Sequence, residues 1–269
     1  MKKKFIEAAI WIVIIGAVAL ALKTHYSRAE SGELVWILAP TAAAVECLSG
    51  ISFTYETGAG YISQSQAVMI APACAGVNFL IVAFLMAGMM GIFRLAPWKA
   101  KAGWLGFSLA AGYGLTVIIN ALRIILAMAL YNADIYAAGL TPAAVHRLLG
   151  IAIYLTALYG YFYLLTHGLT WLGAGKSWLA LQNAPGPRPA IVAGLYSLLP
   201  LACYLAITVL IPLLNRPASI GNPEFLIHGT VVLAAGVMLY ASIRFAQLCF
   251  FKFAGKIGCH EADHSYCRR

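Results

Sequence analysis

Charged residues are scarce in this sequence. Asp, Glu, Lys and Arg make up only 10% of its 269 residues, whereas 62% are hydrophobic. Soluble domains carry about 25% charged and about 45–50% apolar residues. This scarcity excludes an ordinary soluble globular domain. Acidic residues are the rarest group, with nine against 18 basic ones, and the net charge is +9.

The positive charge does not indicate a nucleic-acid partner, because the sequence lacks a basic stripe interleaved with aromatic residues. Its basic residues lie mainly in short connections and tails beside apolar runs. Several of these runs reach the roughly 17–25 residues needed to cross a bilayer. We therefore expect an all-α, polytopic membrane protein that is surrounded by lipid and binds no nucleic acid.

The six cysteines include no C-x-x-C pair, so neither a disulfide framework nor a redox motif is predicted. The C-terminal tail does contain side chains of the types that bind zinc (Cys259, His260, His264 and Cys267). Their spacing fits no standard zinc pattern and favours a flexible cytoplasmic tail. We expect neither a metal nor a cofactor.

The N-terminus resembles a signal peptide, since Lys2, Lys3 and Lys4 precede an apolar run over residues 5–22. No small-residue cleavage site stands out before Lys23. We interpret residues 1–24 as an uncleaved transmembrane anchor whose N-terminus lies in the cytoplasm.

Further apolar runs predict five more transmembrane helices, at residues 75–93, 102–131, 142–166, 191–213 and 225–251. Residues 34–48 are apolar but short, and Pro40 and Glu46 interrupt them, so this segment is expected to be interfacial or re-entrant. Residues 49–65 are polar and predict a loop or short hairpin. The expected fold is a helical bundle of about six spans plus one or two interfacial or re-entrant helices. It divides into a core (25–170), a cytoplasmic linker (171–190) and a C-terminal hairpin with a basic tail (191–269).

The distribution of Lys and Arg predicts the orientation. With the N-terminus inside and six crossings, twelve basic residues lie on the inner side and five on the outer side (Lys23, Arg28, Arg123, Arg147 and Arg216). This excess fits the positive-inside rule, provided that residues 34–48 do not cross. Both termini are then cytoplasmic.

Cys74 is the first candidate for a reactive residue. Pro72, which is favoured in the first turn of a helix, lies where a polar segment gives way to a long apolar run. Cys74 is therefore expected in the first turn, where the helix dipole favours the reactive thiolate. Asn78, four residues later, would share its face. The alternative is that Cys74 is a small buried hydrophobic residue.

Two cationic side chains complete the candidate site. Arg123 lies within an apolar run, so it must face a polar cavity, form a pair or extend to the headgroups, and Asn120 shares its face. His146 lies in the second turn of a helix opened by Thr141 and Pro142, and Gly150 leaves room for a close neighbour. Taken alone, His146 is more typical of a surface histidine. Under the predicted topology Cys74, Arg123 and His146 converge on the outer side.

These segments resemble the exosortase/archaeosortase family of membrane transpeptidases. The resemblance rests on Pro-Ala-Cys-Ala-Gly-Val-Asn-Phe at residues 72–79, Asn120-x-x-Arg123 and His146-x-x-x-Gly150. The segment Trp-Ile-Leu-Ala-Pro-Thr-Ala at residues 36–42, followed by Val45-Glu46, is similar to the exosortase K branch in particular. The match covers residues 35–166 and leaves the last two predicted spans outside.

This resemblance implies a function and a division of roles. Cys74 would be the nucleophile, His146 would transfer protons, and Arg123 would bind the oxyanion or the substrate. Such enzymes cut a C-terminal sorting signal, Pro-Glu-Pro-like in many members, ahead of the substrate's transmembrane helix. They are thought to pass the acyl group to an acceptor. Asn78 and Asn120 would support the site. Glu46 would orient His146 or Arg123, or would be an interfacial carboxylate.

Two other classes of protein are compatible with the composition. A small transporter or assembly subunit could line a polar pathway with Arg123 and His146, although no internal inverted repeat is evident. A haem or quinone carrier would need paired histidines facing each other across spans. His146 and His167 instead lie at opposite ends of one predicted helix.

Overall fold

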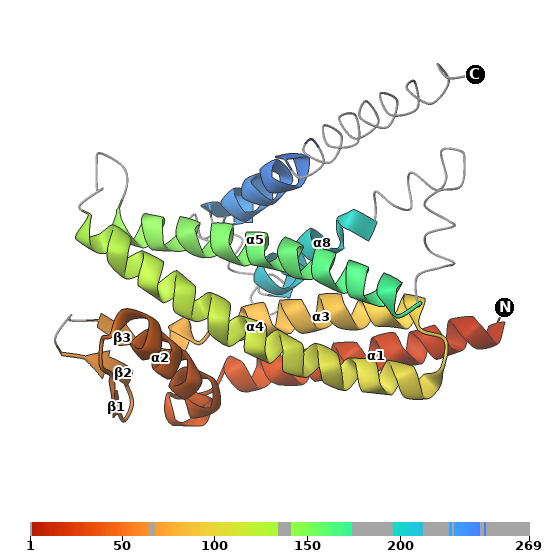
Figure 1. Ribbon diagram of the computed structural model, residues 1–269, viewed down its shortest axis with the longest axis horizontal. Helices are drawn as coiled ribbons and strands as arrows, with labels where there is room; N and C mark the ends of the chain where they lie inside the picture. Colours follow the sequence, from red (N-terminus) through yellow and green to blue (C-terminus); the bar gives the residue numbers. More distant parts are fainter. Residues whose placement is uncertain are drawn as a thin grey trace, which may run out of the picture.

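The computed structural model describes residues 2–64, 68–133, 141–173, 196–211, 226–227, 229–242 and 245. The described chain is mostly helical (Figure 1). Five of its helical segments are long and apolar enough to cross a membrane: Phe5–Tyr26, Gly32–Ser49, Pro72–Arg94, Trp98–Asn132 and Ala144–Trp171. The predicted fold class, a helical bundle with several apolar helices of membrane-spanning length, is confirmed, whereas the predicted number of spans is not tested. The last two predicted spans are described only in part, as the shorter apolar helices Leu199–Leu210 and Gly229–Ser242, and the basic tail lies outside the described residues.

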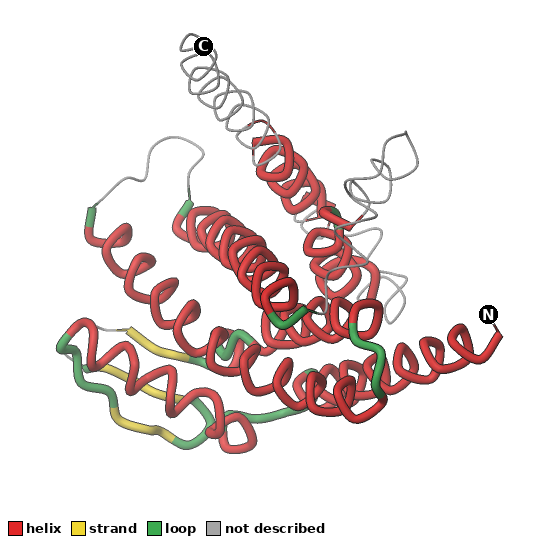
Figure 2. The backbone as a smooth tube through the Cα atoms, turned by 45° about the vertical axis from the view of Figure 1, so that its right-hand side comes forward, coloured by secondary structure: helices red, strands yellow, loops and turns green. Residues whose placement is uncertain are grey.

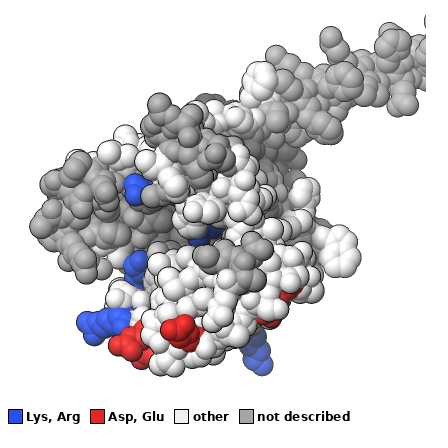
Figure 3. All heavy atoms as spheres, turned by 90° about the vertical axis from the view of Figure 1, so that its left-hand side faces the viewer, with Lys and Arg blue, Asp and Glu red and all other residues white. Residues whose placement is uncertain are grey.

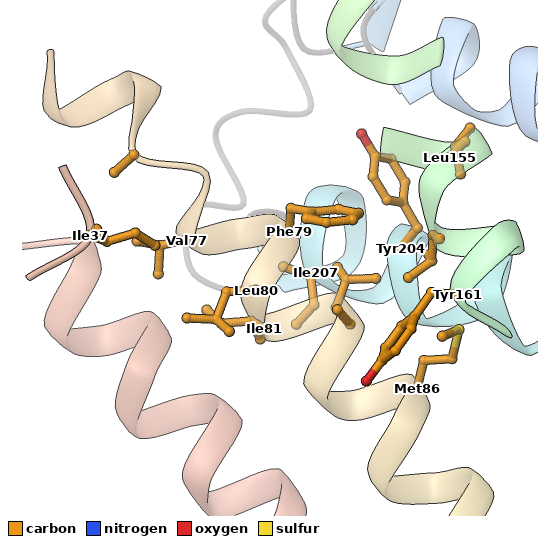
Figure 4. Close-up of a cluster of buried hydrophobic side chains, with 14 of the residues drawn as sticks. Ile37, Val77, Phe79, Leu80, Ile81, Met86, Leu155, Tyr161, Tyr204 and Ile207 are labelled. Carbon is orange, nitrogen blue, oxygen red and sulfur yellow. The ribbon is translucent and has the colours of Figure 1, made fainter. Parts of the chain in front are cut away.

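Helix α3 (Val77–Arg94) is the centre of the bundle. It packs against α1 (Lys2–Tyr26), α4 (Trp98–Asn132), α5 (Pro142–Trp171) and α8 (Leu199–Leu205). Its sequence is apolar around its whole circumference, which is typical of a helix enclosed by other helices. Figure 4 shows its side chains meeting those of its neighbours, with residues labelled from α3 (Val77, Phe79, Leu80, Ile81 and Met86), α5 (Leu155 and Tyr161) and the α8 region (Tyr204 and Ile207).

Helix α4 begins earlier than predicted. Residues 94–101 were expected to form a basic loop, but α4 starts at Trp98, directly after Pro97. Lys101 is thereby buried within the helix, where its Nζ lies 2.8 Å from the Glu7 carboxylate of α1. This ion pair accounts for a lysine at a buried position, because burial of a charge requires a partner.

Helix α2 (Val35–Ser49) continues through Pro40 and Glu46, the two residues that interrupt its apolar sequence. Pro40 has no N–H to donate to the carbonyl of Trp36, four residues earlier. The Tyr113 hydroxyl of α4 donates to that carbonyl instead, at 2.7 Å, and the rings of Trp36 and Tyr113 stack. A side chain from the neighbouring helix thus satisfies the carbonyl that the proline leaves free.

A small antiparallel sheet modifies the all-α expectation. Strands β1 (Thr54–Glu56), β2 (Gly60–Ser63) and β3 (Val68–Ile70) pair in the order β1-β2-β3. The predicted hairpin is therefore present, and a third strand extends it towards Cys74. The sheet and α2 lie together at the end of the bundle opposite the N-terminus (Figures 1 and 2).

Candidate active site

Cys74 does not lie in the first turn of the long helix, and that prediction is wrong. Pro72–Cys74 form a separate 3₁₀ turn (η2), and α3 begins only at Val77. Because Cys74 and Asn78 belong to different elements, the expectation that they share one helix face is also wrong. Pro72 does open a helical turn, as predicted, but that turn ends at the cysteine. Cys74 is half-buried and stands outside the regular helix.

Gly76 causes this break. Its φ of 72° is left-handed, a conformation that residues with a Cβ rarely adopt. A Cβ on Gly76 would also lie 3.1 Å from Thr116 Cγ2 and 3.2 Å from Asn120 Cγ. Glycine therefore permits both the turn between η2 and α3 and the close approach of the Cys74 segment to α4.

Arg123 and His146, which were expected on the same side of the membrane, are in direct contact. Arg123 Nη2 lies 2.6 Å from His146 Nε2. Because a guanidinium only donates, Nε2 must accept, and the imidazole is neutral with its proton on Nδ1. Gly150 makes room for this arrangement, since a Cβ there would lie 3.0 Å from Arg123 Nε. Thr141 caps α5 as predicted by accepting from the backbone N–H of Ala144 at 3.2 Å, which fixes the turn that carries His146.

Asn120 and Tyr154 connect this pair to the Cys74 segment. The Asn120 side chain is fully buried; its Nδ2 donates to the Cys74 carbonyl oxygen at 2.5 Å, and its Oδ1 accepts from the Tyr154 hydroxyl at 2.8 Å. Arg123 Nη1 lies 3.2 Å from the Tyr154 hydroxyl and 3.5 Å from Asn120 Oδ1. Tyr154 also stacks on Phe79 of α3, with ring centroids 4.7 Å apart. The network thus joins η2, α3, α4 and α5.

The remaining predicted site residues have other partners. Asn78 Oδ1 accepts from Lys23 Nζ at 2.6 Å, which ties α1 to the start of α3. Glu46 Oε1 accepts from the Phe53 backbone N–H at 2.5 Å and organises the chain between α2 and β1. The predicted role of Glu46 in orienting His146 or Arg123 is therefore wrong.

Within the described part of the chain, His146 lines three cavities, and two of them also contain Arg123 or Cys74. One, of about 400 Å³, is lined by two arginines, three tyrosines, His146, Asn78 and mainly apolar residues, and its walls include no Asp or Glu among the described residues (arginines: Arg123 and Arg147; tyrosines: Tyr26, Tyr154 and Tyr204). The other, of about 280 Å³, is lined by Cys74, His146 and mainly apolar residues of β3 and α4. Figure 3, which faces the end of the bundle that carries the sheet, shows basic atoms within a recess near its centre. His146 therefore lines both the cavity beside the thiol and the cavity beside the guanidinium.

Two residues that contact the candidate site, Tyr154 and Lys23, were not predicted from the sequence. Tyr154 is one of several tyrosines in an apolar helix, but it lies four residues after Gly150 and eight after His146, on the same face. That spacing could have revealed it. Lys23 was interpreted only as the polar flank of the first span, and nothing in its sequence surroundings indicates a partner 55 residues away.

The chain matches no family model, and neither a curated protein nor a solved structure matches it at a significant level. A functional assignment therefore depends on the residues of the site.

Proposed function

We propose that this protein is a membrane-embedded cysteine transpeptidase or protease that cleaves C-terminal sorting signals of exported proteins through a thioester intermediate. The observation that carries the proposal is the contact between Arg123 and a neutral His146 on the cavity that also contains Cys74. The resemblance of residues 35–166 to the exosortase/archaeosortase family supports the same assignment and supplies the class of substrate.

The chemistry follows from the three side chains. The Cys74 sulfur attacks the scissile carbonyl, His146 takes the thiol proton and returns it to the leaving amine, and the C–N bond breaks. In this structure His146 Nε2 accepts a hydrogen bond from Arg123 Nη2, so Nε2 is not free to take a proton. A substrate oxygen that draws the guanidinium towards itself frees Nε2 for the proton, so substrate binding and activation of the base are coupled. An acceptor amine or water then attacks the thioester and restores the thiol.

The length of α4 supports a site at a membrane surface. Its 35 residues span about 52 Å, and Arg123 lies about 37 Å from its start, beyond the roughly 30 Å of hydrocarbon. We propose six crossings, a bacterial cytoplasmic membrane and a site on the outer, periplasmic side. In that arrangement α2 is re-entrant or interfacial, because it starts beside Tyr113 in the middle of α4. The excess of basic residues on the opposite side supports this orientation.

This orientation predicts which thiols a membrane-impermeant reagent reaches. In a chain whose other five cysteines are replaced by serine, Cys74 should be labelled in intact spheroplasts, because it lines an open cavity at the outer end of the bundle. In a second chain all six native cysteines are serine and Lys99→Cys introduces the only thiol, at the opposite end of α4. This thiol should be labelled only after lysis. The reverse pattern would show that the proposed orientation is wrong.

The thioester provides the direct test of the function. The substrate to use is a tagged protein encoded near this chain that ends in a short motif, an apolar span and a basic cluster. Hydroxylamine added to membranes containing both proteins should yield a substrate fragment ending in a hydroxamate, because the nucleophile attacks the Cys74 thioester. A transporter or assembly subunit with Arg123 and His146 along a polar pathway would yield no such fragment.

A further inference from the structure

Strand β3 forms one edge of the sheet, and that edge leads to Cys74. It pairs with β2 on one side only, with Tyr61 opposite Ile70, Ile62 opposite Met69 and Ser63 opposite Val68. The strand ends at Ile70, and the 3₁₀ turn that ends at Cys74 begins two residues later. An edge strand exposes unpaired backbone donors and acceptors that another extended chain can use.

The backbone of Met69 faces this open edge. The carbonyl oxygen of Ile70 lies directly against Gly60, so Ile70 faces β2. Backbone groups alternate in direction along an antiparallel strand, and the N–H and C=O of Met69 therefore point away from β2. Among the described residues, the Met69 backbone forms no backbone–backbone hydrogen bond outside the sheet itself.

The open edge also borders the cavity of the candidate nucleophile. Val68 and Met69 line the cavity of about 280 Å³ that contains Cys74 and His146. The Met69 side chain is 52% exposed. A peptide placed along β3 would thus have its backbone beside Met69 and a carbonyl within the space that the thiol faces.

We propose that the substrate binds as an extended strand added to the free edge of β3, with its backbone hydrogen-bonded to the N–H and C=O of Met69. This inference rests on the proposed function and adds the binding mode of the substrate's backbone. β3 leads into α3, and the substrate segment leads into its own transmembrane helix, so the two strands run parallel. Backbone hydrogen bonds position the scissile carbonyl of the substrate independently of the substrate's side chains. The cavity walls then determine which substrate side chains fit.

The test compares two alkylating reagents on Cys74 in a full-length chain whose other cysteines are serine. The first is an acetylated tetra-alanine chloromethyl ketone, which has an extended backbone, and the second is iodoacetamide, which has none. The measured quantity is the ratio of their alkylation rates, so a general change in thiol reactivity cancels. Met69→Pro removes the outward N–H and should lower this ratio by roughly twofold to tenfold, the effect of one ordinary hydrogen bond. Met69→Ala keeps the N–H and removes the same side chain, so the ratio for Met69→Pro is compared with that for Met69→Ala and should be lower by this factor.

Tyr55→Pro is the matched control on the opposite edge of the sheet. Tyr55 pairs with Tyr61, which faces β3, so the Tyr55 backbone also points away from the sheet, on the side remote from Cys74. This variant should leave the ratio unchanged. In the chain that retains Met69, N-methylation of a single amide of the peptidyl reagent should lower the ratio of alkylation rates as much as Met69→Pro does.

Equal ratios for Met69→Pro and Met69→Ala, or an equal loss for Tyr55→Pro, would overturn the proposal, as would insensitivity to N-methylation at every position of the reagent. These outcomes would leave the proposed function intact, because thioester formation is measured separately with a protein substrate. Failure to trap a thioester, in turn, would remove the function even if the peptidyl reagent prefers the β3 edge.

Discussion

Replacement of Cys74 by alanine is expected to abolish processing of the tagged substrate, a loss of roughly 10⁴-fold or more, because the proposed nucleophile is removed. The contact that joins this segment to α4 should survive, since Asn120 donates to the backbone carbonyl of Cys74 and not to its sulfur. The variant should therefore insert and accumulate like the parent chain. Immunoblotting of substrate and product in membranes measures both results.

Cys47→Ala and Cys203→Ala are the controls for this prediction. Cys47 is exposed on α2 and Cys203 lies in α8, and neither lines a cavity that His146 also lines. Both variants should process substrate normally. Full processing by Cys74→Ala would show that Cys74 is not the nucleophile, whereas equal losses in all three variants would indicate a general effect of cysteine removal.

Arg123→Lys is expected to reduce turnover by about 10²-fold or more, the size of effect seen when one oxyanion donor is removed. Arg123 reaches His146 Nε2 through Nη2 and the Tyr154 hydroxyl through Nη1. Lysine keeps the charge but has one terminal nitrogen, so it cannot hold both contacts in the same planar arrangement. Steady-state turnover of the tagged substrate measures the loss, and Arg123→Gln should be at least as impaired.

Arg147→Lys is the matched control, because Arg147 is the next residue after His146 and lines the same cationic cavity. Its turnover should stay near that of the parent chain. If Arg123→Lys also retains near-normal turnover, Arg123 only anchors the helix at the headgroups, where lysine serves as well. A second signature is the pH profile: the Arg123–His146 contact requires a neutral imidazole, so activity should fall in acid as His146 gains a proton.

Much of the helical scaffold was predictable because its signals are local. Pro142 and Thr141 specify the start of α5, and the long apolar runs specify α1, α3 and α4. The contact between Arg123 and His146 was also accessible, since a cation within an apolar helix requires a polar partner.

The features that the sequence did not reveal depend on contacts between distant segments. One such feature is the continuity of α2 across Pro40, because the Tyr113 hydroxyl from another helix supplies the missing hydrogen-bond donor. Cys74 was placed in a regular helix because Pro72 is a strong start signal. Gly76 was a visible counter-signal, and its left-handed conformation ends that turn before α3 begins.

The bond between Lys23 and Asn78 imposes an order on the assembly of the site. Its partners are separated by 55 residues, so a ribosome adding about 5–20 residues per second completes the second partner roughly 3–11 s after the first. During that interval the ammonium of Lys23 has no amide to bind, and this favours keeping the end of α1 at the membrane surface. Once α3 has been synthesised, the Lys23 ammonium can donate its hydrogen bond to Asn78. A generic leader sequence in place of the first helix would insert the chain but would lack the Lys23 hydrogen bond to Asn78, which lines the cavity beside Arg123.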